Sequence, residues 1–167
     1  MVRVGQPAPL RAGPLDLRLY RGRNLVLVFY RGAWCPVCDL QLRGLARDYG
    51  KFRKRNAEIA GVSNDPEAVS RAARSALRLP FPLVSDPGGA AIRRWGVTRG
   101  RNRLNELDRW SHGLVGLKGY AQPAVFVVDA AGRVRYARIG ADPLDRPSNA
   151  ELLKVLGELR KRRRAHG

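Results

Sequence analysis

The sequence predicts an α/β domain with a central mixed sheet flanked by helices. Strand-like and helix-like segments alternate along most of the 167 residues, which is the order that builds such sheets. An apolar run over residues 25–30 predicts a buried central strand, and a helical pattern of apolar residues begins at Cys35. Residues 123–128 and 133–139 flank a short Gly-containing turn and predict an antiparallel hairpin, so the sheet should contain both kinds of strand pair.

The length of the chain suits one domain. A chain of 167 residues can bury about 70% of its unfolded surface without cross-links, so we expect a single domain over residues 1–167. A basic C-terminal tail should begin at about residue 160. No apolar stretch approaches the length of a membrane span, and no cleavable signal pattern opens the chain. We therefore expect a cytoplasmic location and no membrane partner.

The remaining elements follow from periodicity, capping residues and turn residues. The expected elements are a short edge strand at 15–19, a helix over 35–52, a strand at 57–62, a helix that Asp65 caps and Pro66 begins and that ends near 77–79, a short strand at 80–86, a brief helix at 90–95, and a final helix opened by a capping box of Ser148 and Glu151. Residues 97–121 lack a clear pattern and predict a long ordered loop, with some helix near 104–110.

The only two cysteines lie together where the central strand gives way to a helix. Cys35 and Cys38 form a C-x-x-C motif at the predicted helix N-terminus, with Trp34 and Pro36 beside them. Unpaired backbone N–H groups and the positive end of the helix dipole stabilise a thiolate there, and Arg31 can add a positive charge. In a reducing compartment such a pair is more often catalytic than structural. The motif therefore indicates thiol redox chemistry.

Two other interpretations of the cysteines are weaker. A structural zinc site needs two further ligands, and the chain offers only His112 and His166, of which the second is the penultimate residue. We therefore expect no metal, and the sequence indicates no other cofactor. Inert core thiols are the second interpretation, which Trp34 and Pro36 fit poorly. His112 itself is either a surface histidine or a proton donor near the thiols.

The apolar stripe of the predicted helix distinguishes the two thiols. The stripe consists of residues at spacings of four and three, namely Cys38, Leu42, Leu45, Tyr49 and Phe52. Cys38 should thus face the core, whereas Cys35 lies in the first turn, off the deepest part of the stripe. We expect Cys35 to be the more exposed thiol with the lower pKa, and Cys38 to be the partner that resolves its products.

The chain is strongly basic, with a formal net charge of +18 from 32 Lys and Arg against 14 Asp and Glu. Such an excess raises the question of nucleic-acid binding. The arginines are scattered over every predicted element except for the terminal run at 160–164, and no nucleic-acid motif accompanies them. Solvated surface explains most of the charge. Weak nonspecific polyanion binding is the alternative, and a noncatalytic binding module that uses this run is a separate hypothesis.

Several short motifs occur in an order shared with a known family. They are residues 4–5 with 8–9, 29–32 followed by 34–38, 61–65, 81–86 and 123–129. This order resembles the AhpC/TSA peroxiredoxin-like family of the thioredoxin-fold superfamily, from about residue 4 to the final helix. The resemblance implies a thioredoxin-like fold and redox activity at Cys35 and Cys38.

Two positions depart from the peroxiredoxin pattern. When the motifs are aligned, Cys38 falls on the peroxidatic cysteine, and Cys35 replaces the threonine that helps bind peroxide. Pro123 replaces an arginine, and after Gln122 it resembles the cis-proline that faces the C-x-x-C of thioredoxins. The resemblance thus implies a cis Pro123 beside the thiols, and Arg31 is a candidate to substitute for the missing arginine.

The resemblance implies two related reactions. In the first, which we expect from the C-x-x-C motif, the Cys35 thiolate attacks an oxidised protein thiol, and Cys38 resolves the mixed disulfide. In the alternative, a peroxide oxidises one cysteine to a sulfenic acid and the other cysteine condenses with it. Thioredoxin or a similar reductant would then be the electron donor. Both routes end at the same Cys35–Cys38 disulfide.

Overall fold

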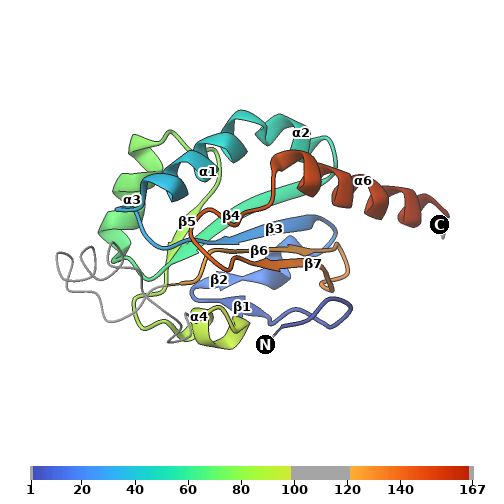
Figure 1. Ribbon diagram of the computed structural model, residues 1–167. Coiled ribbons are helices and arrows are strands. Elements are labelled where there is room, and N and C mark those ends of the chain that lie inside the picture. Colours follow the sequence, from blue (N-terminus) through green and yellow to red (C-terminus); the bar gives the residue numbers. More distant parts are fainter. Residues whose placement is uncertain (1, 99–120, 166–167) are drawn as a thin grey trace.

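A five-stranded mixed sheet forms the centre of the computed structural model, which describes residues 2–98 and 121–165 (Figure 1). The strands are β3 (Asn24–Phe29), β4 (Ala57–Ser63), β5 (Leu83–Ser85), β6 (Ala124–Val128) and β7 (Val134–Ile139). Their order is β5-β4-β3-β6-β7. The strand β3 pairs in parallel with β4 and antiparallel with β6, so the predicted mixed sheet is confirmed.

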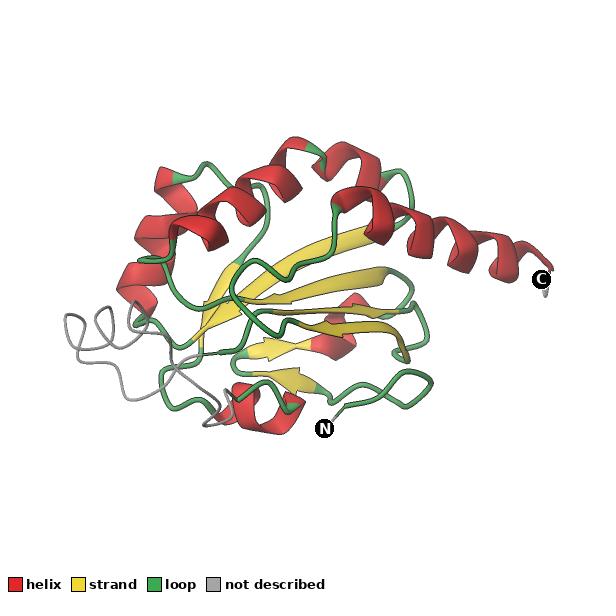
Figure 2. Cartoon of the chain, in the orientation of Figure 1, coloured by secondary structure: helices red, strands yellow, loops and turns green. Residues whose placement is uncertain are grey.

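Helices cover one face of the sheet, and a mixed layer covers the other (Figure 2). The elements outside the sheet are α1 (Pro36–Arg47), α2 (Tyr49–Arg53), α3 (Glu67–Ala76), α4 (Ala90–Trp95), α6 (Asn149–Ala165), and the short pair β1 (Arg11–Ala12) and β2 (Leu15–Asp16). The helices α1, α2 and α6 pack on one face, and α4 with the β1–β2 pair packs on the other (Figure 1).

The alternation of side chains along β3 divides the core in two. Successive side chains of a strand point to opposite faces, so Val26 and Val28 join the core under α1 and α6. Leu25, Leu27 and Phe29 join the core over α4. Both sets are buried, which explains why this strand has no polar positions in its interior. The central strand thereby fixes the position of the turn that carries the cysteines.

The chain departs from the sequence-based expectation at residues 15–19. The strand β2 ends at Asp16, and residues Leu17–Tyr20 form a 3₁₀ helix instead. The Asp16 carboxylate accepts a hydrogen bond from the backbone N–H of Arg18 at 3.0 Å, which caps that helix. Local capping by Asp16 therefore outweighs the apolar alternation that suggested a strand.

The expected helix over 35–52 is divided at Asp48, between α1 and α2. The Asp48 carboxylate accepts hydrogen bonds from Lys51 and from Asn149, both at 2.8 Å. Asn149 also donates to the carbonyl of Gly44 at 2.9 Å. The first residue of α6 thus ties down the end of α1, and this contact between distant parts of the chain is invisible to helical periodicity.

The beginnings of α3 and α6 also differ from expectation. Pro66 has an extended ψ of 151° and caps α3, which starts at Glu67, so Asp65 is not the capping residue. Ser148 accepts the N–H of Glu151 at 3.1 Å, as a capping box requires, but the Glu151 carboxylate accepts from the Tyr136 hydroxyl instead. The basic run continues α6 as helix to Ala165 rather than forming a separate tail.

Several predictions fall on parts of the chain that the structure does not describe. These are most of the predicted loop at 97–121 with its helix near 104–110, His112, and His166. The other major elements, namely the central strand, the brief helix before residue 96, the hairpin and the final helix, are confirmed.

Replacing Gly61 with alanine should destabilise the protein by about 1–3 kcal/mol, because the added methyl group would overpack the core. Gly61 pairs with Val28 in the sheet, and a Cβ built on it would lie 2.5 Å from the Cδ2 atom of buried Leu83. Urea unfolding measures the change. The matched control is Gly50→Ala, since Gly50 lies in α2 with nothing within 4 Å of such a Cβ. Equal stability of the two variants would contradict the prediction.

Candidate active site

A tight turn after β3 delivers the cysteines to the start of α1. Gly32 has a φ of +152°, and a Cβ at this position would collide with the Trp34 indole, so only glycine fits. The N–H of Cys35 then bonds to the carbonyl of Gly32 at 3.1 Å, and the carbonyl of Cys35 accepts the first helical bond from Asp39 at 3.1 Å. Cys35 is therefore the N-cap residue of α1.

A buried carboxylate holds this turn against the neighbouring strand. Asp65 follows β4 and is only 3% exposed. Its Oδ2 accepts hydrogen bonds from the N–H of Ala33 at 2.8 Å and from the Ser63 hydroxyl at 2.9 Å. Asp65 thus connects the carboxyl ends of β3 and β4, and it fixes the backbone two residues before Cys35.

Both thiols are reduced and buried. Cys35 is 1% exposed and Cys38 is 0% exposed, so the expected difference in exposure between them is wrong. The first turn of α1 lies against the body of the protein, and Trp34 packs on the same core cluster as both sulfurs. The prediction that Cys38 faces the core is confirmed.

The electrostatic environment nevertheless distinguishes the two thiols. The pKa of Cys35 is lowered to about 6, chiefly because the Cys38 thiol donates a hydrogen bond to its sulfur. The backbone N–H of Cys38 and the charges of Arg31 and Arg146 lower this pKa further, while burial opposes them. The pKa of Cys38 is raised, because its proton is held in the bond to Cys35 and because burial disfavours its charge. The pair thus shares one proton, with the negative charge on Cys35.

Alkylation of Cys35 should show its half-maximal rate near pH 6, because the thiolate is the reactive form. The lowered pKa means that the rate rises as the pH increases through 6 and is level above it. In urea-unfolded protein, the control, both thiols should reach half their maximal rate at about pH 8.5. Peptide mass spectrometry after short pulses of iodoacetamide identifies the labelled residue. Labelling of Cys38 before Cys35 would contradict the assignment.

An arginine from the loop before α6 contacts the deeper sulfur. The Nη2 atom of Arg146 lies 3.2 Å from the Sγ atom of Cys38. The same guanidinium donates from Nε to the carbonyl of Pro143 at 2.8 Å and from Nη1 to the Gln41 side chain, one turn along α1. These bonds orient Arg146, so that its positive charge lies next to the Cys38 sulfur rather than pointing into solvent.

Three residues that the sequence placed at the site surround the dithiol. Arg31 is 7% exposed, and its guanidinium carbon lies 4.7 Å from the centre of the Trp34 ring, a cation–π distance. Its charge helps to lower the pKa of Cys35, and Arg146 contacts the sulfur of Cys38. Pro36 occupies the first position of α1, where its missing N–H costs no hydrogen bond.

Gln122 and Pro123 lie just before β6 and bond to the chain that follows β7. No peptide bond between residues that the structure describes is cis, so the predicted cis Pro123 is wrong. The Pro123 carbonyl accepts from the N–H of Gly140 at 2.7 Å, and the Gln122 side chain donates to the carbonyl of Gly140 at 2.5 Å. These bonds continue the β6–β7 pairing beyond the strands, and the peptide bond before Pro123 is trans. The argument for a thioredoxin-type peptide site is thereby removed.

Metal binding has no support within the described part of the chain. No three residues of the types His, Cys, Asp and Glu cluster in residues 2–98 and 121–165 so as to hold an ion. The thiol pair instead has an arginine and a helix N-terminus as its neighbours, and these stabilise anions.

Arg146 and Gln41 are the site residues that sequence reasoning missed. Arg146 lies 108 positions from Cys38 and is one of many arginines, so neither spacing nor composition singles it out. Asp65 lay within a motif but was interpreted as a helix cap. The one sequence signal that could have pointed to Arg146 is its place in the loop before the final helix, since loops often carry functional residues.

The fold and the buried dithiol define a thioredoxin-fold protein whose two cysteines lie close together at a helix N-terminus, as in thiol oxidoreductases. Residues 7–137, which include both cysteines, match the AhpC/TSA family, and the chain belongs to that family.

The curated relatives are named as peroxiredoxins. The chain is 34% identical over 84 residues to peroxiredoxin Q, chloroplastic, of Sedum lineare, covering 50% of this chain and 45% of that protein. It is 36% identical over 102 residues to the Arabidopsis thaliana protein of the same name, covering 58% of this chain and 47% of that protein. The chain thus spans about half the length of the curated relatives it matches.

Solved structures of peroxiredoxins share the fold over almost the whole chain. Peroxidoxin BcpB from Mycobacterium tuberculosis has a TM-score of 0.73 at 22% identity, covering 96% of this chain and 98% of that one. Peroxiredoxin Q of Xanthomonas campestris has a TM-score of 0.71 at 22% identity, covering 95% and 97%.

Proposed function

We propose that this chain is an enzyme that reduces peroxides through the Cys35–Cys38 pair. The observation that carries the proposal is a dithiol with one lowered pKa inside a chain of the AhpC/TSA family. Peroxide reduction was the alternative to protein-disulfide exchange in the interpretation of the sequence. The peroxiredoxin Q relatives and the trans Pro123 now favour it.

The first step uses the charge distribution of the pair. The Cys35 thiolate attacks one oxygen of the peroxide, the O–O bond breaks, and Cys35 becomes a sulfenic acid. The second oxygen leaves as an anion and needs a proton. Cys38 holds the shared proton beside Cys35 and donates it, which releases an alcohol or water and leaves Cys38 as a thiolate.

Arg146 acts in the second step. The thiolate formed on Cys38 lies next to the guanidinium of Arg146, whose contact with the sulfur stabilises the new charge. This thiolate attacks the sulfur of the Cys35 sulfenic acid, hydroxide leaves, and a Cys35–Cys38 disulfide forms. One peroxide has then taken two electrons from the pair. A thioredoxin or a similar dithiol returns them from outside.

Protein-disulfide exchange is the second candidate, since the lowered pKa of Cys35 at a helix N-terminus would also serve it. Burial of both sulfurs opposes it, because a protein disulfide must reach the thiolate directly. We propose the cytoplasm as the location, as expected from the sequence. In the described part of the chain, no helix is sufficiently long and apolar to span a membrane.

The experiment compares the two oxidants without an electron donor. The reduced protein is mixed with an equimolar amount of hydrogen peroxide or of oxidised insulin, and free thiols are counted with time. Peroxide is expected to consume both thiols at least about tenfold faster, since a molecule of a few atoms needs a smaller opening at the covered pair than a protein disulfide does. Catalytic turnover with a thioredoxin system follows. Faster oxidation by insulin would reject peroxide as the substrate.

A further inference from the structure

Two adjoining hollows lie between the last turns of α6 and the chain that leads into β4. One is lined by Lys54, Arg55, Gly157, Arg160, Lys161 and Arg164. The other is lined by Gly22, Arg53, Lys54, Arg55, Asn56, Arg160, Arg163 and Arg164. Because Lys54, Arg55, Arg160 and Arg164 line both, the hollows form one feature, which we call the basic cleft.

Most cations of the basic cleft have no anionic partner. Arg53 pairs with Glu58, and Arg55 donates to a backbone carbonyl at 3.1 Å. No ion pair within the described residues involves the remaining five, which are Lys54, Arg160, Lys161, Arg163 and Arg164. Their mutual repulsion is unrelieved in the free protein, so a bound polyanion would remove it.

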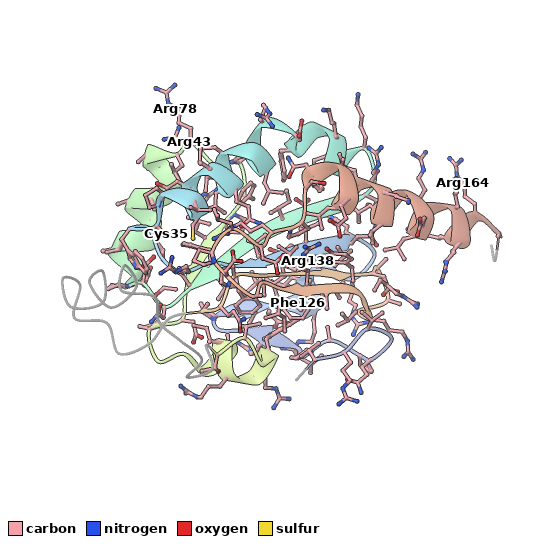
Figure 3. All side chains as sticks on the ribbon, viewed as in Figure 1. Cys35, Arg43, Arg78, Phe126, Arg138 and Arg164 are labelled. Atoms are coloured by element: carbon pink, nitrogen blue, oxygen red, sulfur yellow. The ribbon has the colours of Figure 1, made fainter. Side chains whose placement is uncertain are left out.

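The basic cleft lies far from the thiols. Gly22 precedes β3 and Asn56 precedes β4, at the ends where Asn24 pairs with Ala57. The cysteines follow the opposite end of β3. Figure 3 shows Cys35 and Arg164 at opposite ends of the molecule. A ligand in the basic cleft therefore leaves the redox site open, and its binding is independent of the proposed peroxide chemistry.

The lining of the basic cleft indicates the chemistry of its ligand. No aromatic side chain lines either hollow, so unpaired bases would find no stacking surface there. Arg160 and Arg164 lie four residues apart on one side of α6, so they are separated by about 6 Å along the helix axis. This separation is close to the distance of about 7 Å that two nucleotides of one strand span along the axis of a DNA duplex. We propose that the basic cleft binds the phosphate backbone of double-stranded DNA, without base specificity.

The test measures binding of a fluorescein-labelled DNA duplex by fluorescence anisotropy at several salt concentrations. The cleft variant carries Lys54→Gln, Arg160→Gln and Arg164→Gln. The control carries Arg74→Gln, Arg78→Gln and Arg94→Gln, which are exposed, have no ion pair within the described residues, and remove the same charge. Thermal melting and peroxide turnover should be equal in both variants, since neither alters the thiol site.

Counterion release gives the expected size of the effect. Each phosphate contact changes the slope of log K against log salt by about −0.9, so the cleft variant should have a slope smaller by about 2.7. At about 0.1 M salt its affinity should fall about 500-fold, whereas the control should change less than about threefold. Equal losses in both variants would show that only net charge matters. That result, or no binding by the wild type, would overturn the proposal.

Competition separates DNA from other polyanions. Unlabelled duplex should displace the probe at lower phosphate concentration than inorganic polyphosphate does. Polyglutamate at the same concentration of charges should displace it less well than either. More effective displacement by polyphosphate or by polyglutamate would assign the basic cleft to that ligand and would overturn the proposal for DNA. Because the assay involves no redox step, failure here would leave the proposed peroxide reduction untouched.

Discussion

Replacing Cys35 with serine is expected to lower peroxide-driven oxidation of the protein by on the order of a thousandfold or more, since the nucleophile is lost. The hydrogen bond to Cys35 that raises the pKa of Cys38 is lost in this variant, but burial still raises the pKa of this remaining thiol and disfavours its reactive thiolate. Stopped-flow measurement of peroxide consumption gives the rate. The chain has only two cysteines, so the mass of the product identifies the oxidised residue without ambiguity.

The Cys38→Ser variant is the partner of this experiment. It should still form one sulfenic acid on Cys35, but it cannot close the disulfide, so oxidation stops after one event. A reagent that traps sulfenic acids should then label Cys35. Rapid oxidation of Cys38 in the Cys35→Ser variant would reverse the two roles and would agree with the position of Cys38 in the family alignment.

Replacing Arg146 with glutamine should slow disulfide formation by about 10- to 100-fold, the effect of losing a hydrogen bond to a charged group worth about 1.5–3 kcal/mol. The guanidinium contacts Cys38 at 3.2 Å, and its charge also lowers the pKa of Cys35. The half-maximal pH of Cys35 alkylation should consequently rise. Quenched-flow sampling with mass spectrometry separates sulfenic acid from disulfide, and sulfenic acid should accumulate.

The matched control for this variant is Arg47→Gln. Arg47 lines the same surface groove beside α1 as Arg146, but its partner is Asp48 at 3.9 Å rather than a sulfur. Its replacement removes the same charge nearby and should leave both rates within about twofold, as expected for an exposed pair. Similar losses in the two variants would mean that the general field of the basic surface, and not the contact with Cys38, assists the reaction.

The central strand could be predicted because all its residues are buried, and the hairpin because a short turn with Gly132 separates β6 from β7. The run over residues 25–30 is apolar on both faces, and only an interior strand of a covered sheet requires that. The stripe that includes Cys38 and Leu42 likewise required a core on one side of α1. Periodicity reports which side of an element is buried, and it succeeded for these elements, although it did not predict the burial of Cys35.

Contacts between distant segments could not be predicted in this way. Arg146 reaches Cys38 because Asn149 ties the start of α6 to the end of α1 through Gly44 and Asp48. Each of these polar residues is ordinary in its local sequence. The trans Pro123 was missed for a similar reason, since bonds to Gly140 determine the chain there. Polar partners far apart in sequence leave no periodic signal.

The burial of both sulfurs affects the two half-reactions of the proposed cycle differently, because oxidation uses a small molecule and reduction uses a protein. The oxidant in the proposed cycle is a molecule of a few atoms, whereas a reducing protein must place its own sulfur against the disulfide. With Cys35 1% exposed and Cys38 0% exposed, the first turn of α1 has to open before such a protein can act. In the proposed cycle, the covered pair would therefore favour small oxidants over proteins. The rate of that opening limits turnover of the proposed cycle when both the peroxide and the reducing protein are saturating.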